Sequence, residues 1–224
     1  MKRIILSFLL VGMLLPLMAQ KQYATTVVEK KRIVTGIEEF SLPSQTIFGN
    51  ALLWAVNEGP QGKEEIVDID FGKERLSMVY NLKRDGDDDP AYVCRLQLQV
   101  TENQVVFTVK DVKMHGGLKS MFSNFDKLNP EKKTKHADII REFERLNDEK
   151  LNSLFNFIRE HQLQVTNWDN IRSNSLQRGM SEDEVMLIYG KPASKQSDGT
   201  TTQYLFSSFV RVFIENGKVK SFVN

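Results

Sequence analysis

Residues 179–192 read Gly-Met-Ser-Glu-Asp-Glu-Val-Met-Leu-Ile-Tyr-Gly-Lys-Pro, and this stretch predicts a short helix with both of its ends encoded. Ser181 can act as the N-cap, and Glu184 can reach back to it in a capping box. Gly190 offers a left-handed exit, and Pro192 prevents the helix from continuing. A helix of about two turns is unstable alone in water. We therefore expect its apolar side to pack on the chain that follows.

The chain after this helix predicts a small sheet. Asn216-Gly217 separates two apolar runs, and this dipeptide is the strongest short signal for a β-hairpin. Before the capped helix, Ile171 and Leu176 indicate a first helical segment. The composition turns to short elements near residue 165, so we expect a second domain at 165–224 with the order ααβββ. Its three expected strands are 203–207, 210–215 and 218–223.

The motifs of this tail resemble the outer-membrane-assembly lipoproteins of the BamE and SmpA type over roughly residues 167–224. The resemblance rests on the helix Gly179–Val185, the exit Gly190-Lys-Pro192, the strand that bears Tyr204, and the turn Asn216-Gly-Lys-Val219. It implies the ααβββ fold and a general role in protein interaction. Those lipoproteins carry a lipid on an N-terminal Cys, and no Cys stands directly after the first apolar run here, so we expect no such anchor.

The preceding part of the chain predicts an antiparallel sheet covered by helices. Four sequential strands with tight turns read as a meander, and within 91–100 apolar and polar residues alternate as in a sheet with one dry face. Such a face requires a cover, which two helices with apolar stripes can supply. The expected elements are a strand at 31–40, a helix at 44–58, strands at 65–71, 75–83, 92–100 and 104–114, and a long helix at 134–161.

This order of strand, helix, four strands and long helix resembles an uncharacterised family of bacterial secreted domains with a TATA-box-binding-protein-like (TBP-like) fold. The matching stretches are Ser44–Trp54 and the hairpin Leu96–Val109, and the resemblance covers roughly 24–161. It implies a first domain at 24–164 of class α+β, in tandem with the second. It implies no catalytic residues, and the name of the fold implies no DNA binding.

The N-terminus has the three regions of a secretory signal peptide. Lys2 and Arg3 precede the apolar run 4–15, and we expect cleavage after Ala19. A membrane anchor is the alternative, but the run is shorter than the roughly 20 residues that span a bilayer. Removing 1–19 leaves 28 basic against 29 acidic residues, a formal net charge of −1. This balance argues against a nucleic-acid partner. We expect the periplasm or the periplasmic face of the outer membrane.

The segment 118–128 leaves two interpretations open. Its apolar residues fall on one side of a helix, so Met121, Phe122 and Phe125 could form a helix that docks on a partner or on a membrane surface. Alternatively, the segment is a lid that packs on the sheet or on the long helix. The apolar side consists of Leu118, Met121, Phe122, Phe125 and Leu128.

The residue types that carry chemistry are scattered in the sequence. Asp85, Asp87 and Asp89 match the opening of a calcium loop, but position 96, where the closing acid belongs, is Leu. We therefore expect a solvated connection there.

The histidines do not have the spacing of metal ligands, and no GxSxG motif occurs, so we expect no catalytic group and no cofactor. The single Cys94 cannot form an intramolecular disulfide, and we expect it to be a buried thiol. The three histidines are His115, His136 and His161.

Three classes of function remain. The first is an exported, non-catalytic envelope protein, a module for protein interaction or assembly with an envelope protein as partner and peripheral membrane contact as an option. The second is a binder of a small ligand or cell-wall fragment in a cleft between the two domains. The third is a hydrolase with an unrecognised site, which requires His, Asp and Glu side chains to meet in space.

Overall fold

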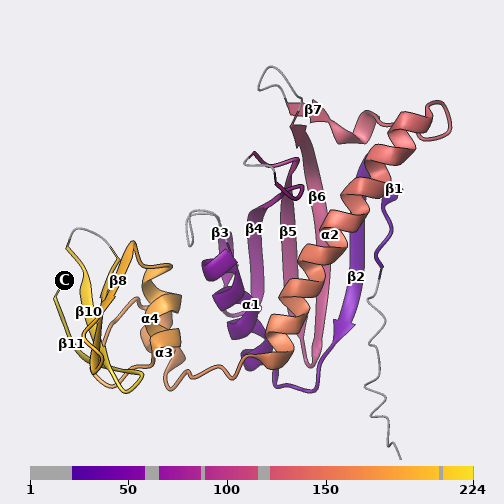
Figure 1. Ribbon diagram of the computed structural model, residues 1–224. Helices are drawn as coiled ribbons and strands as arrows, with labels where there is room; N and C mark the ends of the chain where they lie inside the picture. Colours follow the sequence, from indigo (N-terminus) through magenta and orange to yellow (C-terminus); the bar gives the residue numbers. More distant parts are fainter. Residues whose placement is uncertain (1–21, 59–65, 87–88, 116–121, 207–208, 224) are drawn as a thin grey trace, which may run out of the picture.

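Two separate antiparallel sheets organise the structure, which is a computed structural model (Figure 1). It describes residues 22–58, 66–86, 89–115, 122–206 and 209–223. The expected signal peptide lies outside these residues. Within them, no helix combines the length and the apolar character needed to cross a membrane. The chain is therefore of class α+β, with the larger sheet formed before residue 125 and the smaller one after residue 193.

The larger sheet has seven strands in the order β1-β2-β6-β5-β4-β3, with β7 paired to β6. Five of its strands were expected, and their bounds differ from the prediction by at most one residue at each end. The sequence did not predict β1 and β7, which have three residues each and therefore show little periodicity. The strands are β1 (Thr26–Val28), β2 (Lys31–Glu39), β3 (Ile66–Asp70), β4 (Arg75–Leu82), β5 (Tyr92–Thr101), β6 (Gln104–His115) and β7 (Phe122–Asn124).

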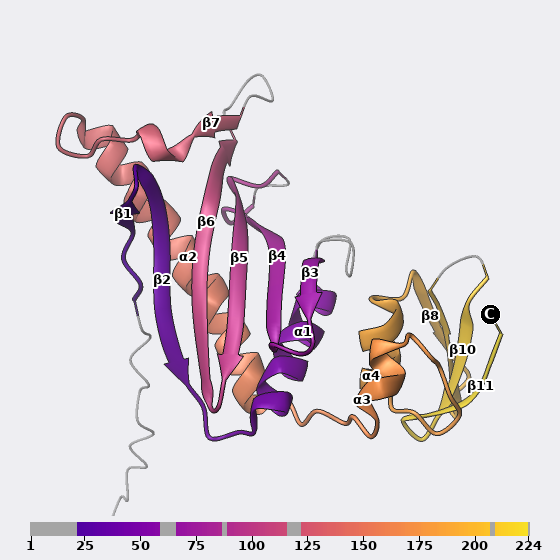
Figure 2. The same cartoon turned by 180° about the vertical axis from the view of Figure 1, so that it is seen from behind.

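Helices α1 (Ser44–Glu58) and α2 (Thr134–Glu160) cover one face of this sheet (Figure 1). The side chains that face them alternate along each strand and form the core, as the sequence predicts. Seen from behind, the opposite face of β2, β6, β5 and β4 carries none of the described helices (Figure 2). We call it the open face. The covered face includes Leu76, Met78, Tyr80, Leu82, Cys94, Leu96, Leu98, Val105, Phe107 and Val109, all buried.

The described part of the segment 118–128 is not a docking helix but packs on the sheet and α2, in agreement with the lid interpretation. It forms β7 followed by a single 3₁₀ turn, η2 (Phe125–Lys127). Phe125 is fully buried, with its ring 4.7 Å from that of Phe143 and 6.1 Å from that of Tyr92. Its apolar ring fills the gap between the sheet and α2, so it is not available as a docking contact. Met121 and the side chain of Phe122 lie outside the described residues.

The smaller unit has four strands where three were expected. Its sheet order is β11-β10-β9-β8, and helices α3 and α4 precede it in the chain. The additional strand, β8, reads Ser-Lys-Gln-Ser and is exposed throughout, so it lacks the apolar alternation by which strands are predicted. Leu176 lies beyond α3. The elements are α3 (Trp168–Arg172), α4 (Glu182–Tyr189), β8 (Ser194–Ser197), β9 (Thr201–Leu205), β10 (Arg211–Glu215) and β11 (Lys218–Val223).

Both turn predictions in the smaller unit are confirmed. Asn216 and Gly217 have φ values of 51° and 72°, and positive φ at both positions is typical of the tight hairpin turn that Asn-Gly favours. Gly190 follows α4 with a φ of 83° and a ψ of −158°. That combination is essentially restricted to glycine. The chain therefore leaves α4 in an extended direction toward β8.

Candidate functional site

The capping box of α4 is formed as the sequence predicts. The backbone N–H of Glu184 donates to Ser181 Oγ at 3.2 Å, and the backbone N–H of Ser181 donates to Glu184 Oε2 at 2.7 Å. These two hydrogen bonds satisfy donors that would otherwise be unpaired at the start of the helix. The hydroxyl of Ser181 also donates to the backbone oxygen of Gln164. The cap is therefore connected to the chain segment 161–167, which we call the linker.

Glu184 binds the linker with its second carboxylate oxygen. Oε1 accepts the backbone N–H of Thr166 at 2.8 Å, the Thr166 hydroxyl at 2.7 Å and the backbone N–H of Asn167 at 3.2 Å. The side chain is fully buried, and burial alone would raise its pKa. The hydrogen bonds from Ser181, Thr166 and Asn167 outweigh that burial and lower the pKa of Glu184. A buried carboxylate thus fixes the linker against α4.

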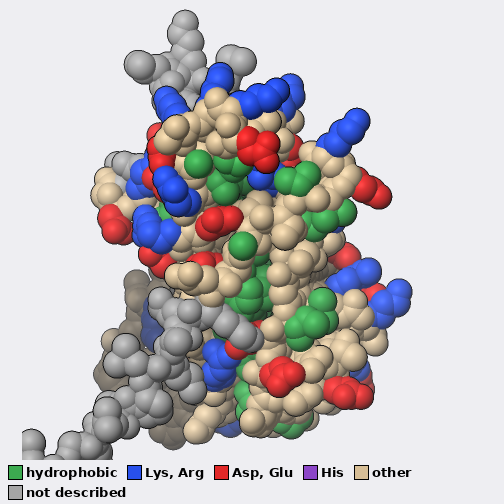
Figure 3. Space-filling view, turned by 90° about the vertical axis from the view of Figure 1, so that its right-hand side faces the viewer, with side chains coloured by type: hydrophobic (Ala, Val, Ile, Leu, Met, Phe, Trp, Pro, Cys, Tyr) green, Lys and Arg blue, Asp and Glu red, His purple; other side chains and the backbone are tan. Residues whose placement is uncertain are grey.

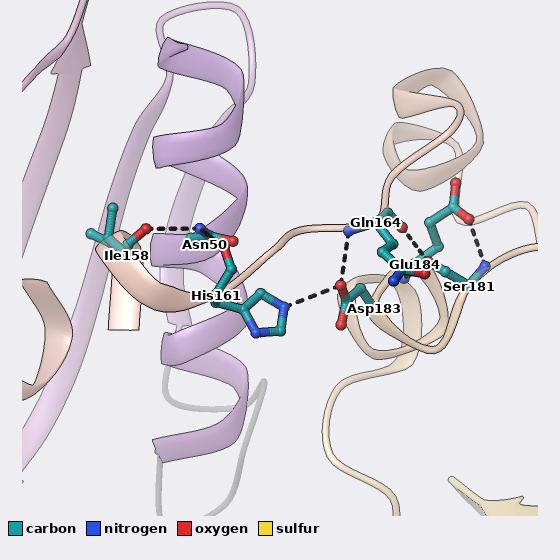
Figure 4. Close-up of polar contacts among 7 residues, drawn as sticks. All are labelled: Asn50, Ile158, His161, Gln164, Ser181, Asp183 and Glu184. Atoms are coloured by element: carbon teal, nitrogen blue, oxygen red, sulfur yellow. Dashed lines mark hydrogen bonds and ion pairs between the residues drawn. The ribbon is translucent and has the colours of Figure 1, made fainter. Parts of the chain in front are cut away.

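Asp183 joins the two units at a second point (Figure 4). Its Oδ2 accepts the backbone N–H of Gln164 at 2.9 Å and lies 3.1 Å from Nε2 of His161, the residue that ends α2. On the other side, the side-chain amide of Asn50 in α1 donates to the backbone oxygens of Ile158 and His161 at 3.0 and 2.9 Å. The end of α2, the linker and α4 are therefore connected by hydrogen bonds.

Apolar packing supports these polar contacts. A Cβ atom at Gly49 would lie 2.3 Å from Leu163 and 2.8 Å from Trp168, so only glycine lets the linker approach α1 so closely. The ring of Trp168 lies 6.4 Å from that of Phe71, and the Arg172 guanidinium lies 5.9 Å from the Phe71 ring. We call this set of polar and apolar contacts the junction.

The junction borders a surface hollow of about 440 Å³. The ring of His161 stacks on Phe157 at 4.8 Å along one side of it. A hollow of this size falls in the range of small-ligand sites. Its lining combines apolar and polar groups: Leu53, Asn57, Phe157, His161, Gln162, Gln164, Ser181, Glu182, Asp183, Met186 and Gly217.

The open face of the larger sheet is a second candidate surface, and it is mostly neutral at its centre. Thr35 pairs with Thr108 across β2 and β6, and Thr108 pairs with Gln97 across β6 and β5. In the adjacent row, Ile37 and Val106 are paired and are 53% and 43% exposed. The face therefore presents hydroxyl, amide and aliphatic groups on a backbone that the covering helices hold in place.

No family model matches this sequence, and no curated protein matches it. Two solved structures share part of its shape. A DUF4468 family protein from Bacteroides ovatus ATCC 8483 gives a TM-score of 0.46 at 10% identity, covering 63% of this chain and 94% of that one. A TBP-like protein from Parabacteroides distasonis ATCC 8503 gives 0.46 at 11% identity, covering 61% of this chain and 98% of that one. The α+β assignment rests on the sheets described above.

The acidic residues predicted as weak metal candidates do not gather into a described site. Asp85 and Asp89 are exposed in the connection between β4 and β5, and Asp87 lies outside the described residues. Among the residues that the structure describes, no group of three or more His, Cys, Asp or Glu side chains could hold a metal ion. The expected solvated connection agrees with the exposure of Asp85 and Asp89.

The histidines and Cys94 also lie apart. His136 accepts the backbone N–H of Asn129 at 2.9 Å near the start of α2, and His161 ends that helix. A helix of 27 residues is about 40 Å long, so these two side chains cannot act together. The side chain of His115 is outside the described set. Cys94 is buried, as expected, and burial raises the pKa of its thiol.

Sequence reasoning missed most of the junction. The capping box was readable because its members are three residues apart, but Thr166 and Asn167 are 18 and 17 residues from Glu184. The sequence does not reveal that Gly49 contacts Leu163, because glycine occurs in helices for several reasons. Contacts between residues so far apart leave no local signal, so the sequence did not place the two units relative to each other.

Proposed function

We propose that the chain is an exported, non-catalytic binding protein of the cell envelope that holds a protein partner on the open face of its larger sheet. The observation that carries this proposal is the open face itself, on which none of the described helices lies. The junction supports the proposal, because it holds the smaller unit next to α1 and the β3 edge of the same sheet, so that the two units form one body for a partner to bind (Figure 2).

The composition of the open face favours protein binding. Burying hydroxyl, amide and aliphatic groups avoids the large desolvation cost of burying charges, and the centres of protein interfaces are depleted of charged residues. Four strands spaced about 4.8 Å apart and about eight residues long give roughly 500 Å² of flat area, somewhat less than the roughly 800 Å² per partner of a stable interface. Because the sheet is held by two helices, little ordering is needed on binding.

The shifted ionisable groups of the described residues have structural partners, which supports a non-catalytic role. Burial, together with the hydrogen bond to Glu142, raises the pKa of Tyr92. The paired Arg84 guanidinium in turn lowers the pKa of Glu142, and this contact ties the end of β4 to α2. These groups hold a strand against a helix, as Glu184 holds the linker against α4.

Site-specific photocrosslinking in cells tests the proposal. A benzophenone amino acid at Gln97, in the centre of the open face, should give a discrete adduct with a partner protein. The matched control carries it at Glu149, whose side chain is 54% exposed on the outer side of α2. A discrete adduct at Gln97 that weakens when Thr108 is changed to Arg would support the proposal. Equal adducts at both positions, or adducts at Glu149 alone, would contradict it.

The hollow at the junction favours a second candidate function. Its mixture of Phe157, Met186 and Leu53 with the polar groups of His161 and Asp183 suits a small ligand or a cell-wall fragment. Soluble cell-wall fragments added to the labelled protein should then shift the amide signals of the linker in NMR spectra. Shifts confined to the open face would instead favour the first proposal.

A further inference from the structure

A hollow of about 570 Å³ lies on the open face, where β6 approaches β7 and η2. Its volume is within the range of small-ligand sites. Strands β4, β5, β6 and β7 and the turn η2 supply its walls. The residues that line it are Val79, Val93, Cys94, Arg95, Asp111, Val112, Lys113, Asn124 and Asp126.

A β-bulge shapes this hollow. Arg95 pairs with Lys110, but the next register pair is Val93 with Lys113, so one residue of β5 faces two residues of β6. Asp111 occupies the bulge with a φ of 54°. Bulges locally bend a strand and redirect its side chains, and they are frequent beside functional sites. Here Val112 is buried while Asp111 is exposed, so the bulge turns charged side chains toward the open face.

Basic groups outnumber acidic ones around the hollow. Asp111 lies between two of them, 3.8 Å from Lys31 Nζ and 3.8 Å from Arg95 Nε. One oxygen of Asp126 is engaged with the backbone N–H of Arg32 at 2.8 Å. The lining itself holds two basic residues, Arg95 and Lys113, and two acidic residues, Asp111 and Asp126. The excess comes from two basic neighbours outside the lining, Lys31 beside Asp111 and Lys110, which pairs with Arg95. The excess positive charge favours an anion.

Arg95 has hydrogen-bonding capacity left. Its Nε is buried, and among the described residues it has no hydrogen-bond partner, because 3.8 Å is too long for a hydrogen bond to Asp111. A guanidinium is planar and pairs with a carboxylate through two parallel hydrogen bonds. Beside it, Val79 and Val93 offer an aliphatic surface. A small shift of the Arg95 side chain toward a ligand would satisfy a buried donor that is otherwise unpaired.

We propose that this hollow binds a monovalent carboxylate attached to a short aliphatic chain, with Arg95 and Lys113 as the anion-binding groups. A carboxylate fits better than a doubly charged phosphate, because Asp111 and Asp126 also face the hollow and repel a second negative charge. The inference deepens the proposed function, since the hollow lies on the same open face. The ligand is then a free small molecule or the carboxyl group of a bound partner.

The test uses the mature chain, residues 20–224, and NMR titration with hexanoate. We expect saturable shifts of the amide signals of Val93, Arg95 and Lys113 with hexanoate and none with 1-hexanol, which has the same length without the charge. Shifts that are equal with hexanol would overturn the proposal, as would the absence of shifts. An equal or stronger response to inorganic phosphate would overturn the assignment to a carboxylate.

Three variants test the electrostatic argument: one should weaken the binding of hexanoate, one should strengthen it and one should leave it unchanged. Arg95→Gln should weaken hexanoate binding about tenfold, since it removes a charge-assisted pair. Asp111→Asn should strengthen binding severalfold, because it removes a repelling charge and Asn tolerates positive φ. Arg75→Gln, on the neighbouring strand β4, is the matched control and should change nothing. Melting curves of each variant check that it is folded. A loss of affinity in Asp111→Asn would contradict the electrostatic argument even if Arg95→Gln weakened binding.

Failure of this inference can be separated from failure of the proposed function. If hexanoate leaves the spectrum unchanged while crosslinking at Gln97 still captures a partner, only the carboxylate site is overturned. If hexanoate binds but Gln97 captures nothing, the hollow is a small-molecule site and the protein-binding role of the face is contradicted. The two experiments therefore report on different claims about one surface.

Discussion

Glu184 uses its two carboxylate oxygens for two tasks, closing the capping box of α4 and binding the linker. Glu184→Gln keeps the shape of the side chain but replaces one acceptor with a donor that faces other donors. We expect a loss of about 2–3 kcal/mol in the free energy of unfolding, since hydrogen bonds to a buried charge are worth about that much. Urea denaturation followed by Trp fluorescence measures it. The control, the exposed Glu160→Gln, should change stability by less than about 0.5 kcal/mol.

The same carboxylate makes stability depend on pH. Its pKa in the folded protein is lowered from the ordinary value of 4.5, so the folded state favours the charged form more than the unfolded state does. The stabilisation is complete above that ordinary value and is lost as the pH falls through the folded pKa. We therefore expect the wild type to lose more stability than Glu184→Gln between pH 5 and the acid limit of folding. Parallel slopes of unfolding free energy against pH for the two proteins would contradict this.

At the scale of single elements, the approach of the linker to α1 depends on one glycine. Gly49→Ala improves helix propensity by about 1 kcal/mol, but its Cβ would lie 2.3 Å from Leu163. Overpacking of this kind costs about 1–3 kcal/mol, so we expect a lower melting temperature despite the better propensity. Ser153→Ala on the exposed side of α2 is the matched control and should be neutral or slightly stabilising. An increase in melting temperature for Gly49→Ala would show that the junction can move apart at no cost.

The elements that the sequence could predict are those with strong periodicity or encoded ends. Strand β5 alternates buried and partly exposed residues along its length, and α4 carries its cap and its glycine exit. Strand β8 could not be predicted, because Ser194–Ser197 is polar and pairs only because β9 offers it a free edge. The turn before β2 was also missed, because Glu29 and Lys30 adopt positive φ without the Asn-Gly signal.

For the whole chain, the expected signal peptide gives a direct prediction about the exported protein. Tyr23, shortly after the expected cleavage point, is held in place by its backbone N–H, which donates to Asp148, and by edge contact with the Phe107 ring. We expect mass spectrometry of exported protein to find an N-terminus at Gln20. An exported species that retains Met1 would favour the membrane-anchor alternative.

The junction makes the two sheets mechanically dependent on each other, and this dependence can be measured by proteolysis. In the wild type the backbone N–H groups of Gln164, Thr166 and Asn167 are all bound by α4, so thermolysin should cleave the linker only after local unfolding. Glu184→Gln keeps one acceptor oxygen but removes the charge that binds two of these groups, and we expect cleavage near Leu163 and Val165 to become at least fivefold faster under native conditions. Glu160→Gln should retain the wild-type rate. Equal rates for all three proteins would mean that the apolar contacts of Gly49 with Leu163 and Trp168 hold the linker by themselves, and the buried carboxylate would then stabilise α4 alone.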